Sequence, residues 1–206
     1  MASKGIGESK NPASRKDIPN PYAGSASCRS CHRDIYDSNV LTAHYRDSRP
    51  PDEESIRGSF NPPANRFRLN RFTDVVMEKT DSGFFQTVYI NNILFRKEAF
   101  GMVIGSGRKG QSYLYWDGNR MFQLPISYFT PLNSWCNSPG YNTTIAYFNK
   151  AITGRCIECH GTYAKTTIGP GGATLFDRTS IIYGIDCERC HGPSAAHVDF
   201  QRNHPG

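Results

Sequence analysis

The feature that most constrains this chain is a pentapeptide, Cys-x-x-Cys-His, that occurs three times in 206 residues, at 28–32, 156–160 and 187–191. Two thiols at this spacing can add across the two vinyl groups of one porphyrin, and the adjacent histidine then reaches the iron. The pattern therefore predicts three covalently attached haem c groups. The predicted attachment residues are Cys28, Cys31, Cys156, Cys159, Cys187 and Cys190, and the predicted proximal iron ligands are His32, His160 and His191.

A zinc site is the main alternative for these cysteines. Cys156 and Cys159, together with Cys187 and Cys190, could supply four thiolates to a tetrahedral zinc ion. A zinc site does not require a histidine after each second cysteine, however, and it leaves the copy at 28–32 without a partner pair. The spacing therefore favours haem.

The composition predicts that the polypeptide builds only a modest core. Hydrophobic residues make up 37% of the chain and the mean hydropathy is −0.56. Each haem adds an apolar plate around which side chains can pack, so we expect the apoprotein to be unstable or unfolded. Six of the seven cysteines lie in the three copies. The seventh, Cys136, is expected to be a small buried hydrophobe beside Trp135.

Haem attachment to thiols takes place outside the cytoplasm, so we expect an exported, periplasmic or extracellular protein. Residues 1–21 are polar, rich in Lys, Ser and Pro, and without the apolar region of a signal peptide. We expect them to form a flexible tail that follows a removed signal. No stretch of the sequence is apolar over the length needed to span a membrane.

The formal charge of +6 falls to about +3 once the haem propionates are counted. Such a field can steer docking to an acidic redox partner protein. Three arginines interleaved with phenylalanines at 66–72 superficially resemble a nucleic-acid patch, but beside three haem motifs we expect no nucleic-acid partner. These residues are Arg66, Phe67, Arg68, Arg71 and Phe72.

Hydrophobic periodicity divides the chain into helical flanks and a strand-rich middle. The run at 32–45 has helical spacing that stops near Pro50, and Pro193 can open a helix over 194–203. Turn signals at 81–83 and 117–119 predict two hairpins. The predicted strands are 75–79, 84–90, 113–116 and 120–124, with another strand or two over 95–104.

These patterns predict an α+β fold, dominated by its haems, with helical haem-binding segments, a β-rich insertion at about 60–150 and much irregular structure. Residues 22–206 are expected to form a single domain. The glycine-rich loop at 105–110 lacks the spacing of a phosphate-binding loop, and a surface turn is expected there. The short runs CIECHG and CERCHG, at 156–161 and 187–192, suggest a weak internal repeat.

Three of the six histidines are left after the proximal positions are assigned, and three irons need a sixth ligand. We therefore expect His44, His197 and His204 to be distal iron ligands. On one continuous helix, His44 would lie roughly 18 Å beyond His32, so it should serve a different haem. His197 and His204 would share one face of a helix, about 10 Å apart.

The segment YAGSASCRSCHRDIYDSNVLTAH at 22–44 resembles the opening of the cytochrome c554-like multihaem proteins, and GIDCERCHGPSAAHV at 184–198 matches their Cys-Glu-x-Cys-His-Gly-Pro pattern. The central segment at 104–141 resembles the β-rich insert of a bacterial subgroup. The resemblance implies an exported electron-transfer protein with closely stacked haems. It implies His32, His160 and His191 as proximal ligands, and His44 and His197 as distal ones. Members often carry a fourth motif, so the chain could be part of a longer protein.

The sequence therefore favours an electron carrier over a catalyst, and no catalytic residue is assigned. One alternative is a multihaem reductase or oxidase with one open iron, which would arise if His204 is not a ligand. Another alternative is a structural module that docks haems into a larger complex, a longer multihaem chain or a filament.

Overall fold

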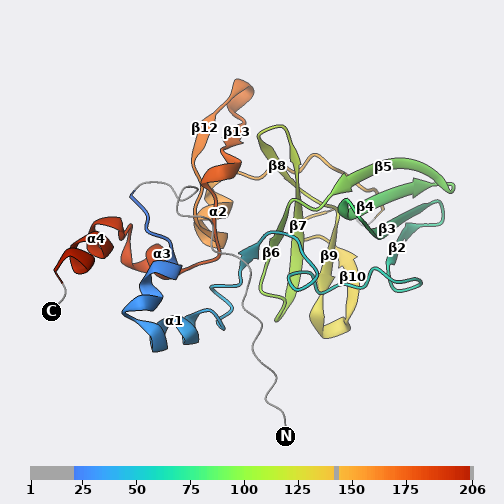
Figure 1. Ribbon diagram of the computed structural model, residues 1–206. Helices are drawn as coiled ribbons and strands as arrows, with labels where there is room; N and C mark the ends of the chain where they lie inside the picture. The colour runs from blue at the N-terminus through green and yellow to red at the C-terminus, as the bar shows by residue number, and fades with distance from the viewer. Residues whose placement is uncertain (1–20, 142–143, 205–206) are drawn as a thin grey trace, which may run out of the picture.

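A computed structural model describes residues 21–141 and 144–204 (Figure 1). The predicted tail at 1–21 lies outside the described residues except for Pro21. The helices are η1 (Ser25–Ser30), α1 (Arg33–Asn39), η2 (Thr130–Leu132), α2 (Gly154–His160), η3 (Pro170–Gly172), η4 (Arg178–Ser180), α3 (Cys187–His191) and α4 (Ala195–Asn203). The strands are β1 (Ser48–Arg49), β2 (Arg66–Asn70), β3 (Thr73–Thr80), β4 (Gly83–Ile90), β5 (Ile93–Ala99), β6 (Met102–Ile104), β7 (Gly110–Asp117), β8 (Arg120–Gln123), β9 (Ile126–Phe129), β10 (Ser134–Asn137), β11 (Gly161–Tyr163), β12 (Thr166–Ile168), β13 (Thr174–Phe176) and β14 (Ile182–Tyr183).

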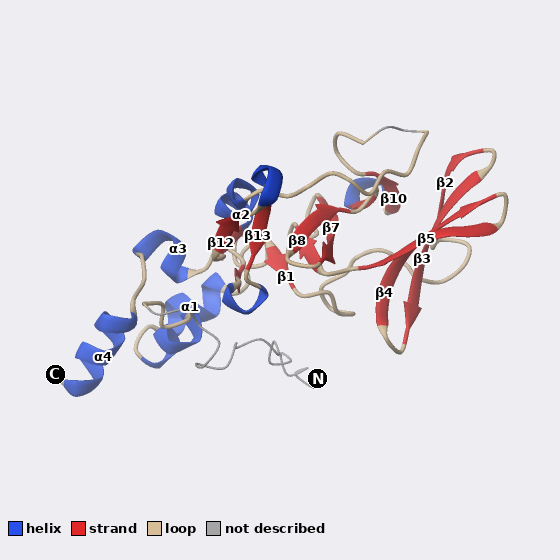
Figure 2. Ribbon diagram, turned by 90° about the horizontal axis from the view of Figure 1, so that it is seen from above, coloured by secondary structure: helices blue, strands red, loops and turns tan. Residues whose placement is uncertain are grey.

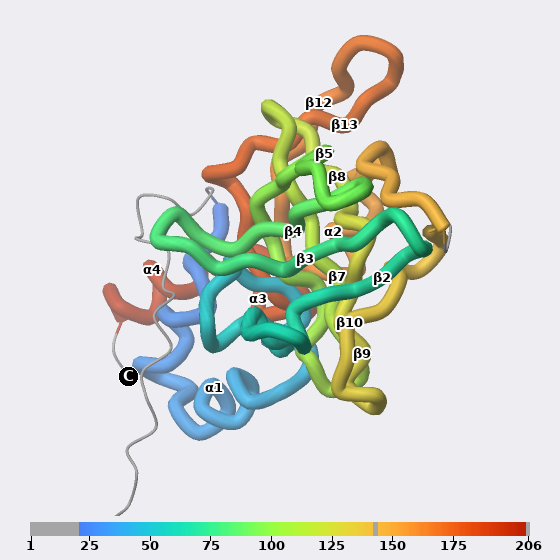
Figure 3. The backbone as a smooth tube through the Cα atoms, turned by 90° about the vertical axis from the view of Figure 1, so that its right-hand side faces the viewer, coloured from blue at the N-terminus to red at the C-terminus, as the bar shows by residue number. Residues whose placement is uncertain are grey.

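Two antiparallel sheets form the strand-rich middle of the chain. One has the order β2-β3-β4-β5, and the other has the order β1-β6-β7-β9-β10 with β8 also paired to β7. Figure 3 shows the four-stranded sheet in front of the larger one. Both predicted hairpins are confirmed, because Thr80 pairs with Gly83 and Asp117 pairs with Arg120. The α+β class is confirmed as well.

The main core lies between these two sheets. Val75 and Met77 of β3 and Tyr113 of β7 are each 0% exposed. The buried amide of Gln86 donates to the carbonyl of Ile126 at 2.6 Å and accepts from its N–H at 3.1 Å. The two sheets are therefore joined by apolar packing and by a satisfied pair of buried hydrogen bonds.

A second core covers the other face of the larger sheet. Side chains alternate along a strand, so Leu114 of β7 points away from the main core and contacts Met121 of β8. Ile157 of α2 and Phe176 of β13 pack onto this face. The chain also runs along β8 as it enters α2, since Ile152 N–H donates to the carbonyl of Met121 at 2.9 Å. The larger sheet therefore fixes the position of α2.

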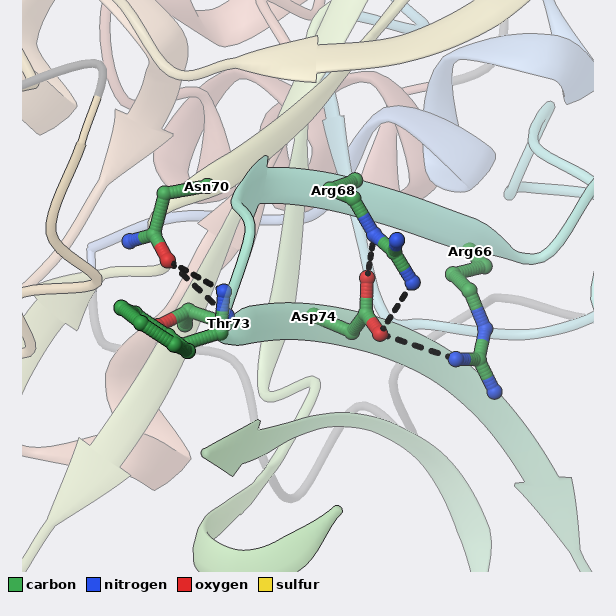
Figure 4. Close-up of polar contacts among 6 residues, drawn as sticks. Arg66, Arg68, Asn70, Thr73 and Asp74 are labelled. Atoms are coloured by element: carbon green, nitrogen blue, oxygen red, sulfur yellow. Dashed lines mark hydrogen bonds and ion pairs between the residues drawn. The ribbon is translucent and has the colours of Figure 1, made fainter. Parts of the chain in front are cut away.

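The arginines of β2 are ion-paired. Asp74 accepts from Arg68 Nε at 2.8 Å and from Arg66 Nη1 at 2.9 Å (Figure 4). The hydrogen bonds from Arg68, with its nearby charge, hold the pKa of Asp74 below its usual range. Asn70 Oδ1 accepts from the N–H of Thr73 and closes the β2–β3 turn. The sequence analysis considered this segment only as a basic patch and did not predict that it forms a strand.

The helix predicted over 32–45 is shorter than expected, because α1 ends at Asn39. Ser38 Oγ donates to a backbone carbonyl of the last helical turn at 2.9 Å. Thr42 Oγ1 donates to the carbonyl of Asn39 at 2.7 Å and accepts from the N–H of Tyr45 at 3.1 Å. These side-chain bonds compete with helical ones, and the chain continues as a series of turns to β1.

The helix predicted over 194–203 is present and differs from the prediction only in where it begins. The structure places Pro193 before the helix, because Ser194 is the N-cap and α4 begins at Ala195. Within residues 21–141 and 144–204, no helix is both long and apolar enough to cross a bilayer.

Candidate functional site

All three copies of the pentapeptide lie on short helices at the side of the molecule opposite the four-stranded sheet (Figures 1 and 2). The first copy spans the end of η1 and the N-cap of α1, the second ends α2, and the third forms α3. In each copy the first cysteine is half-buried and the second is exposed. One thiol of each pair is therefore fixed against the protein, and the other faces outward.

Glu188, inside the third copy, joins that copy to the first. Its carboxylate is 3% exposed. It accepts from the N–H groups of Ala23 at 2.8 Å and Gly24 at 2.7 Å, which lead into η1. It also accepts from the N–H and the hydroxyl of Ser194, both at 2.8 Å. Four donors compensate the burial of this carboxylate and hold η1, α3 and the start of α4 together.

The thiols of the first and third copies are close to one another. Cys28 and Cys187 lie close enough for each thiol to affect the pKa of the other. Burial first, and then the neighbouring Cys187, raise the pKa of Cys28 to about 11. Asn39 Nδ2 lies 3.8 Å from Cys187 Sγ. Porphyrins attached at these two positions would therefore be close neighbours.

The second and third copies are joined by the β11–β14 ladder, which pairs the strand after α2 with the strand before α3. Thr162 Oγ1 donates to the carbonyl of Gly184 at 2.7 Å and contacts Asp186 Oδ1 at 3.0 Å. Arg189 of α3 also donates to the backbone carbonyl of Glu158 in α2. The third copy consequently lies between the other two (Figure 1).

The segment 44–48 contacts the second and third copies. The carbonyl of His44 accepts from the N–H of Ile185 at 2.9 Å. Ser48 Oγ accepts from the N–H of Gly184 at 2.9 Å. Gly184 has a φ of +68°, and an added Cβ would lie 2.1 Å from the carbonyl oxygen of Tyr45. Only glycine fits this close approach between the two segments.

Asp47 of the same segment binds the histidine of the second copy. Its Oδ2 lies 2.8 Å from His160 Nδ1, and the two side chains are 22% and 44% exposed. The hydrogen bond to Asp47 raises the pKa of His160. A carboxylate on Nδ1 leaves Nε2 available to a metal, as is usual for metal-bound histidines. The residues of the second copy therefore fit a covalently bound haem.

Of the predicted distal ligands, His197 lies on the expected helix, whereas His44 and His204 lie outside helices. His44 lies in the turns after α1, so the expected separation of roughly 18 Å along one helix is wrong. His197 lies in α4, whereas His204 is the C-cap with φ −133° and ψ 66°. His204 Nδ1 lies 3.0 Å from the carbonyl oxygen of Phe200, and the two rings stack at 4.5 Å. The N–H of His204 still donates to the carbonyl of Phe200 at 3.0 Å, and the roles of His197 and His204 as ligands stay predictions.

The zinc alternative requires the four cysteines of the second and third copies to converge. Across the described ranges, no group of three or more His, Cys, Asp or Glu side chains is arranged to hold a metal ion. Cys136 lies on β10 and is half-buried rather than buried as expected, and this burial raises the pKa of its thiol.

The sequence alone assigned no role to Asp47 or to Glu188. Asp47 is 113 residues from His160 along the chain, so no local pattern could connect them. Glu188 does lie within a recognised motif, but an exposed glutamate, Glu158, occupies the second copy. The two glutamates occupy different positions of the motif, and the fold shows that Glu188 is the buried one.

Comparison with known proteins adds one match. Residues 140–192 match the family model described as cytochrome c554 and c-prime. This range contains the second and third copies and the β11–β14 ladder between them. Neither a curated protein nor a solved structure matches the chain.

Proposed function

The chain is cytochrome c554-like over residues 140–192, and on this premise we propose that it transfers electrons through three covalently bound c-type haems. When bound, each haem supplies an iron that cycles between the ferric and ferrous states. The protein contributes the thiols, the axial histidines and the distances between the three sites.

One observation carries this proposal: hydrogen bonds join the third copy to both of the others. Glu188 joins it to the segment before the first copy, and the β11–β14 ladder joins it to the second. The neighbouring thiols of Cys28 and Cys187 also place the first and third copies close together. This arrangement supports electron transfer in the spatial order first, third, second copy.

We further propose histidine ligation on both sides of the irons. His32, His160 and His191 are the proximal ligands, since each follows an attachment cysteine. His44, His197 and His204 are the distal ones. The carbonyl of Phe200 accepts from Nδ1 of His204 and leaves Nε2 for iron, which is the tautomer that a ligand needs.

The proposed setting follows from the cofactor. Thiol attachment of haem and the family match support export to the periplasm or beyond, with redox proteins as partners. The enzyme alternative differs in a single property, because it needs one iron without a sixth ligand.

Counting haems tests the proposal. The pyridine haemochrome spectrum and intact mass of the exported protein should give three haems per chain. Replacing Cys156 and Cys159 with alanine should remove one haem, and Cys136→Ala, the matched control, should remove none. A chain that carries no haem would contradict the proposal.

Carbon monoxide separates the carrier from the enzyme. We expect no shift in the difference spectrum of the dithionite-reduced protein, because all irons would be six-coordinate. A prompt shift of about one haem's absorbance would identify an open iron and favour the reductase or oxidase alternative.

A further inference from the structure

Of the three predicted proximal histidines, His160 alone has a ring nitrogen bonded to a carboxylate within the described residues. The partner is Asp47 Oδ2, at 2.8 Å from Nδ1. The rings of His32 and His191 are exposed, and neither has such a contact in the part of the chain that the structure describes. The second copy therefore differs from the other two in its charge environment.

Asp47 is held by the larger sheet rather than by the helix that it contacts. Its carbonyl accepts from the N–H of Gly105 at 2.5 Å, and its own N–H donates to the carbonyl of His44 at 3.0 Å. The next residue, Ser48, pairs with Ile104 of β6. The carboxylate is thus fixed before any ligand binds to His160.

His160 is fixed to the same sheet through the helix α2. The helix α2 packs its buried Ile157, which is 4% exposed, against Met102 and Leu114 of β6 and β7. Both members of the pair therefore lie on one rigid support. A hydrogen bond held in this way has little freedom to move toward solvent or to exchange partners.

This geometry has two electronic consequences of the same sign. An Nδ1–H that donates to a carboxylate makes Nε2 a more basic ligand, which favours the more positive oxidation state of a bound metal. The negative charge of Asp47 also stabilises that state directly, because the pair is only partly exposed to solvent. Both effects favour ferric over ferrous iron.

We propose that Asp47 is a positioning residue that orients His160 and lowers the reduction potential of the haem attached at Cys156 and Cys159. The inference rests on the proposed function and adds to it a ranking of the three haems. The second copy becomes a low-potential site, next to the third copy in the spatial order.

Potentiometric titration of the haem-loaded protein tests the ranking. Asp47→Asn keeps an oxygen that can accept the Nδ1–H but removes the charge. We expect three haems, with one transition shifted upward by about tenfold in its redox equilibrium, which is ~59 mV for one electron. Asp47→Glu, which restores the charge, should recover part of the shift. Asp81→Asn removes the same charge in the β3–β4 turn and should move no single transition.

The alanine variant without Cys156 and Cys159 identifies the relevant transition, which should be the one that is missing. Unchanged potentials in Asp47→Asn, or an equal shift of all three, would overturn the inference while leaving three haems and the proposed function intact. If Asp47→Asn does not fold, Asp47→Ser, which also removes the charge, must move the same single transition upward, and an unmoved transition overturns the inference. A parent protein without haem would instead overturn the proposed function itself.

Discussion

Two regions of the molecule are held together by different forces. The β-sandwich consists of the two sheets formed by β1–β10, and the cluster of haem motifs consists of η1, α1, α3 and α4. In the sandwich, Val75, Met77 and Tyr113 are completely buried between two sheets. In the cluster, α1 and α4 bury no residue, and Leu41 and Phe200 remain 54% and 58% exposed. The contacts between its segments are mostly hydrogen bonds, such as those of Glu188.

This difference shows where folding free energy must come from. Ordering each residue costs roughly 1–2 kcal/mol of backbone entropy, and apolar burial is the main compensation in most domains. The sandwich supplies that burial with its own side chains. The cluster has little of it, so the free energy of ligand binding has to stabilise these helices.

The largest expected effect follows from removing the haems. Replacing the six motif cysteines with alanine should leave the sandwich folded and unfold the cluster, which refines the expectation of an unstable or unfolded apoprotein. Hydrogen exchange should show protected amides in 73–90 and 110–117 and unprotected ones in 25–45 and 187–204. Equal protection of both regions would show that the cluster folds without haem and would contradict this difference between the two regions.

The next effect tests the link between the regions. Ile157→Ala should destabilise the protein by about 2–5 kcal/mol, because it removes a buried side chain that seats α2 on the larger sheet. Urea denaturation followed by far-UV circular dichroism measures the change. Ile168→Ala is the matched control, since Ile168 is 75% exposed and its loss should cost less than about 0.5 kcal/mol. Similar costs at both positions would show that α2 is not anchored by this contact.

A smaller effect is expected within the cluster itself. Glu188→Gln places an amide NH₂ where an oxygen accepts backbone hydrogens, so at least one buried donor loses its partner, at a cost of about 1–3 kcal/mol. Hydrogen exchange should accelerate at Ala23, Gly24 and Ser194. Glu158→Gln changes the exposed glutamate of the second copy and should leave that exchange unchanged. If both variants behave alike, Glu188 does not join the first and third copies.

The features that the sequence predicted correctly are those determined by residues only a few positions apart. The hairpin turns at 81–83 and 117–119 follow from local residues, and both are present. The three motifs likewise stand out because each is five residues long. Helix 32–45 was predicted too long, because periodicity registers apolar spacing but not the side-chain bonds of Ser38 and Thr42 that end it.

Contacts between distant segments could not be predicted from spacing. The order in which the copies lie depends on β11 pairing with β14 and on Glu188 reaching Ala23, 165 residues away. Asp47 was overlooked for the same reason. The strand β2 was also missed, because its arginines indicated a basic surface until Asp74 of the next strand was placed opposite them.

The smallest expected effect concerns that ion-paired edge of the sandwich. The pKa of Asp74 is lowered by its hydrogen bonds to Arg68 and by the nearby charges, so the pairing contributes stability above the carboxyl's unfolded value of about 3.9 and loses it as the pH falls through the lower folded value. Asp74→Asn should therefore cost about 1 kcal/mol at pH 7, and parent and variant should converge as the pH drops below about 4. Urea titrations at several pH values measure the difference. A cost larger than that of Ile157→Ala would mean that charge, not apolar burial, governs the stability of the sandwich, and the contrast with the cluster would disappear.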